Sequence, residues 1–181
     1  MSGLFTRNRV IGLVLAALIA GTDYFVKWYV IAELNLRQVR KVDLLPFFDL
    51  TYTENRGISL GMFQATSMEM RWALVLVTAL IGLVVLIWMM REKLLGDIIG
   101  LAMILGGAIG NIRDRYSLGY VIDYADLHIG DFRPFLIFNI ADAAITIGVV
   151  VILARSLFMS DKDDTDTDVE ANADTVPSEN G

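Results

Sequence analysis

The sequence predicts an all-α membrane protein with four transmembrane helices and a small antiparallel β-sheet at the membrane surface. First, 55% of the 181 residues are hydrophobic, 20% are charged and the mean hydropathy is +0.56, whereas a soluble domain is about 45–50% apolar and about a quarter charged. Second, four apolar segments approach the roughly 20 residues that cross a hydrocarbon core of about 30 Å. Third, a segment rich in aromatic and β-branched residues lies between the first two of them.

The four spans are expected at residues 10–32, 72–90, 94–112 and 135–154. The second span is the clearest, because it has no charged residue and lies between Arg71 and Arg91. A G-x-x-x-G pair in the third span predicts close packing against another helix.

The first segment has an alternative interpretation as a cleaved signal peptide, since Arg7 and Arg9 precede its apolar run. Residues 18–22 resemble the lipid-attachment motif of some signal peptides, but Thr22 stands where the lipidated cysteine must be. The apolar character also continues to Ala32. We therefore expect a retained span.

Four spans place both termini on the same side of the membrane. Charge counting does not decide the side, because six basic residues flank the spans on the terminal side and eight on the other. The tight basic turn at residues 91–93 and the start at Arg7 and Arg9 favour a cytoplasmic location for the termini.

The connection between the first two spans predicts the sheet. Residues 44–53 are rich in aromatic and β-branched types, and residues 58–63 alternate between apolar and polar, with turn residues between the two runs. We expect an antiparallel sheet over about residues 40–63 and a short interfacial helix over 64–71.

The C-terminal residues 161–181 differ from the rest of the chain. They contain eight acidic residues and one basic residue, which leaves 14 basic and 13 acidic residues, a net charge of +1, in residues 1–160. Such a segment has too few apolar side chains to offset the entropy of ordering. The sequence therefore predicts a membrane domain over 1–160, with no indication of nucleic-acid binding, and a disordered acidic tail that is dispensable for chemistry.

Ionisable and amide side chains inside a span are costly and indicate a functional site. With alternating span directions, seven such residues in or just after the first, third and fourth spans fall in the same leaflet, on the side of the two long connections, whereas Asp97 lies near the start of the third span. The seven residues are Asp23, Lys27, Asn111, Asp114, Arg115, Asn139 and Asp142. A single shared site near that membrane surface is therefore expected.

These residues also have structural interpretations. Asp23 and Lys27 are spaced i, i+4 in the order that favours a helical ion pair. Asn139 and Asp142, spaced i, i+3, are able to link helices by hydrogen bonds. His128, which lies in a loop near acidic residues, is expected to be a solvated surface residue.

The candidate reactive groups of such a site are carboxylates, because the chain has no cysteine and no Ser/Lys or Ser/His arrangement falls at this depth. The chain has no cysteine and a single histidine, which excludes thiol nucleophiles and Cys/His metal sites. Two aspartates that share a water form an acid–base pair, in which the ionised carboxylate deprotonates the water and the protonated one polarises a carbonyl. Asp142 is one member. Asp123, in a more apolar context than Asp126 or Asp131, is the best second member.

Three motifs around the third and fourth spans resemble a known family. Residues 110–115 (GNIRDR), 119–124 (GYVIDY) and 134–142 (PFLIFNIAD) closely resemble the lipoprotein signal peptidases, the signal peptidase II family of bacterial aspartyl endopeptidases. Asp23 to Lys27 resembles that family's D-x-x-x-K element, and Asn55 to Gly57 resembles its N-x-G element. The resemblance covers residues from about 8 to 158, and the acidic tail lies outside it.

The resemblance implies four transmembrane helices in the bacterial inner membrane, with both termini cytoplasmic and a small periplasmic β-cradle. It implies diacylglyceryl-modified prolipoproteins as substrates, cut among membrane lipids just before the lipidated cysteine, with no metal or organic cofactor. By matching positions, Asp123 and Asp142 are the catalytic dyad. The other implied site residues are Asn55, Gly57, Asn111, Arg115 and Asn139, which bind and orient the substrate, and Asp23, Lys27 and Asp114, which support the site.

A rival hypothesis is a non-enzymatic transporter or channel subunit that uses Asp23, Lys27 and Asp142 as an ion relay. It predicts polar residues through the other leaflet, which the sequence lacks. A second rival, an intramembrane protease that cuts unlipidated spans, requires a dyad at greater depth.

Overall fold

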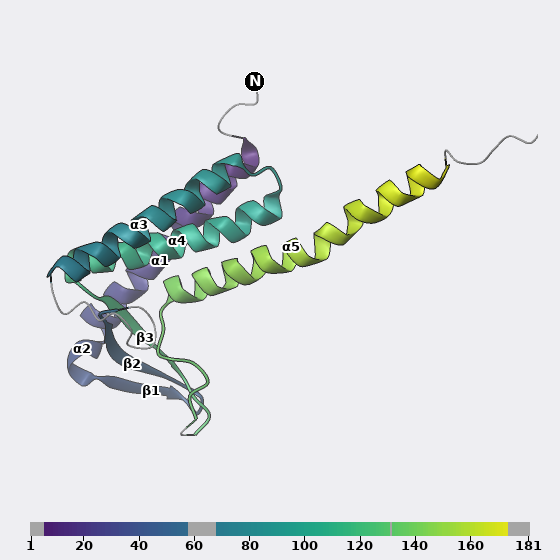
Figure 1. Cartoon of the computed structure of the whole chain (residues 1–181). Coiled ribbons are helices and arrows are strands. Elements are labelled where there is room, and N and C mark those ends of the chain that lie inside the picture. The colour runs from purple at the N-terminus through teal and green to yellow at the C-terminus, as the bar shows by residue number, and fades with distance from the viewer. Residues whose placement is uncertain (1–5, 58–67, 131, 174–181) are drawn as a thin grey trace, which may run out of the picture.

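The fold is a helical bundle with a small sheet at one end of it (Figure 1). The computed structural model describes residues 6–57, 68–130 and 132–173. In chain order the elements are α1 (Arg7–Ala32), α2 (Leu36–Val39), β1 (Lys41–Leu45), β2 (Phe48–Asn55), α3 (Met68–Arg91), α4 (Leu95–Leu118), β3 (Val121–Leu127) and α5 (Ile140–Ala173).

Four helices are long and apolar enough to cross a membrane: α1, α3, α4 and the Ile140–Phe158 part of α5. This confirms the predicted four spans. α4 continues to Leu118 instead of ending at residue 112, so the polar residues expected at the end of the third span lie on its last helical turns.

The start of α5 differs from the prediction. The helix begins at Ile140 and not at residue 135, because Phe138 pairs with Ala125 of β3 in an antiparallel bridge. An extended residue cannot also belong to a helix. The fourth span is therefore shorter at its polar end than its hydrophobicity indicates.

The other end of α5 also differs. Its backbone is helical to Ala173, beyond the expected end of the span at residue 154, and it extends away from the other helices (Figure 1). Helical backbone thus covers residues 161–173, where composition predicts disorder; extending an existing helix needs no new nucleus. That the acidic segment is dispensable stays a prediction.

α4 is the central helix and packs against α1, α3 and α5. Glycines allow these close approaches. A Cβ added to Gly106 would lie 2.7 Å from the carbonyl oxygen of Ala16 in α1, and one added to Gly148 of α5 would lie 2.6 Å from the carbonyl oxygen of Gly100. The predicted packing role of the glycines in the third span is confirmed.

The three strands form one antiparallel sheet in the order β1-β2-β3. β1 and β2 are joined by a turn at Pro46 and Phe47, so the run of aromatic and β-branched residues over 44–53 is divided between two strands. Pro46 has no N–H for a ladder hydrogen bond, which favours a turn at this point. Residues 58–63, expected to be a strand, lie outside the described residues.

The third strand, β3, and the short helix α2 were not predicted. Six consecutive residues of β3 are buried, so the strand lacks the alternation of apolar and polar residues that marks a half-exposed strand. Of the expected interfacial helix over 64–71, residues 64–67 lie outside the described part of the chain, and residues 68–71 form the first turn of α3.

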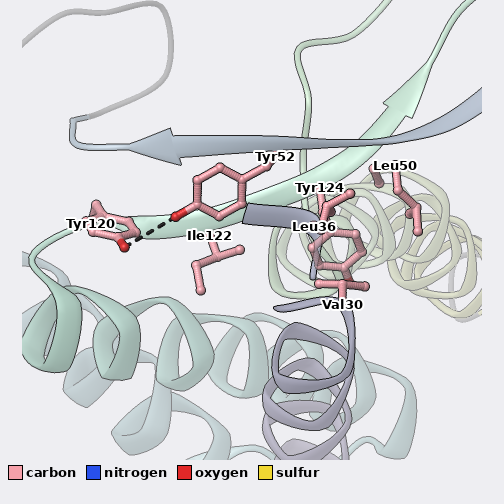
Figure 2. Packing of buried hydrophobic residues seen from close by; sticks show 8 residues of the cluster. Val30, Leu36, Leu50, Tyr52, Tyr120, Ile122 and Tyr124 are labelled. Atoms are coloured by element: carbon pink, nitrogen blue, oxygen red, sulfur yellow. Dashed lines mark hydrogen bonds between the residues drawn. The ribbon is translucent and has the colours of Figure 1, made fainter. Parts of the chain in front are cut away.

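A hydrophobic cluster joins the sheet to the end of α1 and to α2 (Figure 2). Its labelled members are Val30, Leu36, Leu50, Tyr52, Tyr120, Ile122 and Tyr124. The hydroxyl oxygens of Tyr52 and Tyr120 are 3.3 Å apart. Ile122 and Tyr124 of β3 both belong to this cluster, and successive side chains of a strand point to opposite faces. Asp123, between them, is therefore directed to the other face.

Candidate active site

Asp123 lies in the middle of β3, with only 2% of its surface exposed. Its Oδ1 accepts a hydrogen bond from Nδ2 of Asn139 at 2.6 Å, and the side chain of Asn55 also hydrogen-bonds to this carboxyl group. Thr53 of β2 pairs with it in the sheet. Two amide side chains therefore hold this buried carboxyl group.

Asp142 lies in the first turn of α5 and is half-buried. Its Oδ1 accepts a hydrogen bond from Nδ2 of Asn111 at 2.8 Å. Its backbone N–H donates to Oδ1 of Asn139 at 2.9 Å, and the backbone N–H of Asn139 donates to Oδ2 of Asp142 at 3.4 Å. This reciprocal pattern is a capping box with Asn139 at the N-cap.

Asn139 joins the two carboxyl groups. Its fully buried amide donates to Asp123 through Nδ2 and accepts from the N–H of Asp142 through Oδ1. The preceding residue is fixed to β3, because the N–H of Ala125 donates to the carbonyl oxygen of Phe138 at 2.8 Å and the N–H of Phe138 donates to the carbonyl oxygen of Ala125 at 3.1 Å. The structure therefore brings Asp123 and Asp142 to opposite ends of one amide.

Lys27 connects two buried acids that do not belong to the dyad. Its Nζ lies 2.8 Å from Oδ2 of Asp23 and 2.8 Å from Oδ2 of Asp114, and it donates to Oδ1 of Asn111 at 3.5 Å. All four side chains are buried. The predicted Asp23–Lys27 pair is confirmed, and Asp114 is a second partner that the i, i+4 spacing did not reveal.

Each of these acids also accepts a hydrogen bond from the backbone next to a dyad residue. Oδ1 of Asp23 accepts from the N–H of Ala141 at 3.0 Å, and Oδ2 of Asp114 accepts from the N–H of Ile122 at 3.3 Å. Lys27 thus fixes α1 and α4 to the start of α5 and to β3.

Arg115, Gly57 and Asn55 form a chain of contacts at the edge of the site. Nη2 of Arg115 donates to the carbonyl oxygen of Gly57 at 3.2 Å, and the N–H of Gly57 donates to Oδ1 of Asn55 at 3.2 Å. Nε of Arg115 is buried and has no hydrogen-bond partner among the described residues. This arrangement leaves a buried donor available to a ligand.

The environment of Asp123 favours its protonated form. Burial, and after it the neighbouring carboxylate of Asp142, raises the pKa of Asp123 from 3.8 to about 7, against the hydrogen bonds from Asn139 and Asn55. Two adjacent carboxyl groups in a poorly hydrated place do not both ionise readily. The dyad is therefore able to hold one proton near neutral pH.

A cavity of about 250 Å³ opens beside Asp142. Its lining residues are Leu127, Phe135, Leu136, Phe138, Asp142, Ala143, Thr146 and Ile147. The wall is thus almost entirely apolar, with one carboxyl group in it. Within the described ranges, no three His, Asp or Glu side chains are grouped so that they could hold a metal ion.

The expectation that His128 is a solvated surface residue is wrong. Only 14% of its side chain is exposed, and its Nε2 lies 2.7 Å from Oδ2 of Asp49, which is buried. Asp126 is likewise buried, and Nε of Arg133 lies 3.0 Å from its Oδ1. The pairing of β2 with β3 brings Asp49 close to His128. Because β3 was not predicted, this contact was not predictable from the sequence.

Comparison with known proteins assigns this arrangement to a family. The sequence model described as "Signal peptidase (SPase) II" matches residues 15–158. The chain belongs to the signal peptidase II family. It is therefore a protease with multiple membrane spans.

Relatives of this signal peptidase resemble most of the chain. This chain is 52% identical over 151 residues to the lipoprotein signal peptidase of Sphingopyxis alaskensis, and the match covers 83% of this chain and 87% of that one. It is 47% identical over 152 residues to the lipoprotein signal peptidase of Rhizorhabdus wittichii, covering 84% and 88%. A solved bacterial membrane enzyme has the same fold, with a TM-score of 0.72 and 23% identity over 83% of this chain and 89% of that one.

Proposed function

We propose that this signal peptidase removes signal peptides from prolipoproteins whose lipobox cysteine carries diacylglycerol, and that it cuts the peptide bond just before that cysteine. The observation that carries the proposal is the placement of Asp123 and Asp142 on one buried amide beside an apolar cavity. The two relatives named lipoprotein signal peptidases support the substrate class.

In the proposed mechanism the dyad activates a water molecule. The ionised carboxylate takes a proton from the water as the water oxygen attacks the scissile carbonyl carbon, and the protonated partner gives its proton to the carbonyl oxygen. When the tetrahedral intermediate collapses, the C–N bond breaks, the proton taken from the water passes to the leaving cysteine nitrogen, and the hydroxyl proton returns to the dyad. A pKa of about 7 for Asp123 supports a shared proton at neutral pH.

The other polar residues have supporting roles in this proposal. Asn111 and Asn139 fix the orientation of the two carboxyl groups through the hydrogen bonds described above. Arg115, whose Nε has no partner within the described part of the chain, donates to a backbone carbonyl of the substrate. Asn55 and Gly57 hold Arg115 and Asp123 in place.

The cavity suits an apolar ligand that arrives from the membrane. Phe135, Leu136 and Ile147 in its wall are each more than half exposed, and such surface beside a spanning helix contacts lipid. An acyl chain or an apolar signal segment fits these walls. We place this end of the bundle at the periplasmic side of the inner membrane, which leaves both termini cytoplasmic.

The ion-relay alternative requires charged side chains that exchange protons or ions across the membrane. Asp23, Lys27 and Asp114 are instead bound to one another at the end of the bundle near the sheet. At the opposite end Arg155 donates to Asp97 at 2.7 Å. These closed pairs at the two ends favour the peptidase.

A cleavage assay tests the proposal. The purified protein is incubated with a prolipoprotein reporter, with and without diacylglyceryl modification, and the product N-terminus is identified by mass spectrometry. We expect cleavage of the lipidated reporter just before the cysteine, and none by the Asp142→Asn variant. Cleavage of both reporters at equal rates would contradict the substrate class, and no cleavage of either would contradict the proposed function.

A further inference from the structure

The sheet contains a second pair of buried acids, separate from the dyad. Asp49 of β2 and Asp126 of β3 occupy paired positions in the antiparallel ladder, and their exposed fractions are 2% and 1%. Like charges directly opposite each other on two strands destabilise a sheet, and a buried charge without a partner is costlier still. The fold must therefore supply positive charge at this place.

A basic side chain from the connection between β3 and α5 contacts each of the two acids. This connection comprises residues 128–139, of which all but Asp131 are described. Nε2 of His128 lies 2.7 Å from Oδ2 of Asp49. Nε of Arg133 donates to both oxygens of Asp126, at 3.0 and 3.3 Å. These two side chains attach the connection to the sheet, in addition to the backbone bridge between Phe138 and Ala125.

Other groups complete the surroundings of the two acids. Nζ of Lys41 in β1 lies 2.8 Å from Oδ2 of Asp49 and 2.8 Å from Oδ1 of Asp43. The hydroxyl of Thr51 donates to Oδ2 of Asp126 at 3.1 Å. Because Lys41 still neutralises Asp49 when His128 is replaced, the loss of His128 does not leave that carboxylate unpaired.

The attached connection forms part of the cavity wall. After Arg133 the chain continues through Phe135, Leu136 and Phe138, which line the cavity beside Asp142. Phe135 and Leu136 are exposed, at 64% and 61%, so they have little packing of their own to hold them. The contacts of His128 with Asp49 and of Arg133 with Asp126 fix the start of this stretch to the sheet, together with the hydrogen bond from the N–H of His128 to the carbonyl oxygen of Phe47 at 3.0 Å.

We propose that His128 and Arg133 are positioning residues that hold residues 128–130 and 132–138 on the sheet and thereby place the apolar cavity wall for substrate binding. The inference rests on the proposed function for the identity of the substrate. It assigns no chemical step to either residue, since neither touches Asp123 or Asp142. Their loss acts on the binding of the apolar part of the substrate and leaves the dyad intact.

Kinetics with the lipidated reporter test this inference. We expect His128→Ala and Arg133→Ala to raise KM by about fivefold or more, because each loses a contact with an ionised partner, while kcat stays within about twofold, as for the removal of binding that is equal in ground and transition states. His128→Gln and Arg133→Lys, which keep a donor, should recover part of the loss. Asp43→Asn is the matched control, because the Asp43 carboxylate pairs with Lys41 and belongs to β1, outside the connection, and its KM should equal that of the parent.

Amide hydrogen exchange supplies a readout that needs no activity. The hydrogen-bonded amides of His128, Ile129, Phe132 and Phe138 should exchange faster in His128→Ala and Arg133→Ala than in the parent, with α4 unchanged, and the conservative variants should fall between. A parent that cleaves no lipidated reporter contradicts the proposed function and leaves the exchange result as the test of the attachment. Unchanged KM and unchanged exchange in both alanine variants, or a lower kcat at constant KM, would overturn the inference.

Discussion

Asp142 and Asn139 are hydrogen-bonded to each other twice, backbone N–H to side-chain oxygen in each direction, at 2.9 and 3.4 Å. The proposed catalytic carboxylate is therefore also part of the cap that starts α5. Oδ2 of Asp142 accepts the backbone hydrogen bond that caps α5, and Oδ1 accepts from Nδ2 of Asn111. Positioning of the dyad and initiation of the fourth span depend on the same two side chains.

Substitution of Asn139 should separate these two roles. Asn139→Ser keeps an N-cap oxygen but loses Nδ2, the donor to Asp123, so we expect a fall in kcat of about tenfold or more with a smaller loss of melting temperature than in Asn139→Ala. Asn139→Ala loses both and should in addition be destabilised by about 1 kcal/mol. Detergent melting and reporter kinetics measure the two effects. Equal stability and equal activity of the two variants would contradict the double role.

Asp123→Asn and Asp142→Asn should each abolish cleavage while the protein remains folded and binds the lipidated reporter, because an amide neither takes the proton of water nor alternates roles. The Asp123 variant should also melt about 2 °C or more above the parent at pH 8, since it removes a buried charge. Activity within about tenfold of the parent in either variant would exclude an obligatory dyad.

The rate should depend on pH near neutrality. Burial and the adjacent Asp142 raise the pKa of Asp123 to about 7, so the shared proton is lost as pH rises through that value and the general acid disappears. We expect kcat to fall with a slope approaching about tenfold per pH unit on the alkaline side. A pH series from 6 to 9 with constant detergent checks this. A flat profile over that range is the contrary result.

Loss of Lys27 should be the most damaging change in the support network. Lys27→Ala leaves Asp23 and Asp114 buried without their shared cation, which typically costs about 3–5 kcal/mol. Asp23→Ala leaves Lys27 paired with Asp114 and should cost less, and the Asp23→Ala/Lys27→Ala double variant should melt above Lys27→Ala alone. Melting temperatures of the parent and three variants close the cycle. Strictly additive losses would rule out the coupling.

Truncation after Ser160 should change neither the melting temperature nor the reporter activity. The removed segment has eight acids, one base and few apolar residues, and the family match ends at residue 158. Circular dichroism melting and the cleavage assay on the truncated protein test this. A large loss of activity would show that the acidic segment takes part in processing.

Most of the fold was predictable because membrane spans depend on local composition. α3 has no charge between Arg71 and Arg91, and hydropathy alone locates it. β3 was not predictable in the same way, because burial on both faces removes the alternation on which strand prediction depends. The start of α5 was misplaced for a related reason: a bridge from Phe138 to a distant strand overrides local hydrophobicity.

The site was partly predictable. The i, i+4 spacing of Asp23 and Lys27 is a local signal, and the polar residues of three spans fall at one depth. The contact of Lys27 with Asp114 and that of His128 with Asp49 join residues far apart in the chain. No periodicity encodes such pairs, because they depend on how helices and strands are placed relative to one another.

The exposed opening of the cavity beside Asp142 determines which concentration scale applies to its ligand. Phe135, Leu136 and Ile147 in its wall are each more than half exposed, and under the proposed function they face the lipid tails beside α5. On that proposal a ligand arrives laterally from the leaflet, where its amount is expressed as a mole fraction and not as a molarity. Two inhibitors of identical shape then differ in potency by the ratio of their membrane–water partition coefficients. Added detergent weakens both inhibitors by lowering their mole fraction in the apolar phase, although their total amount in the sample stays the same.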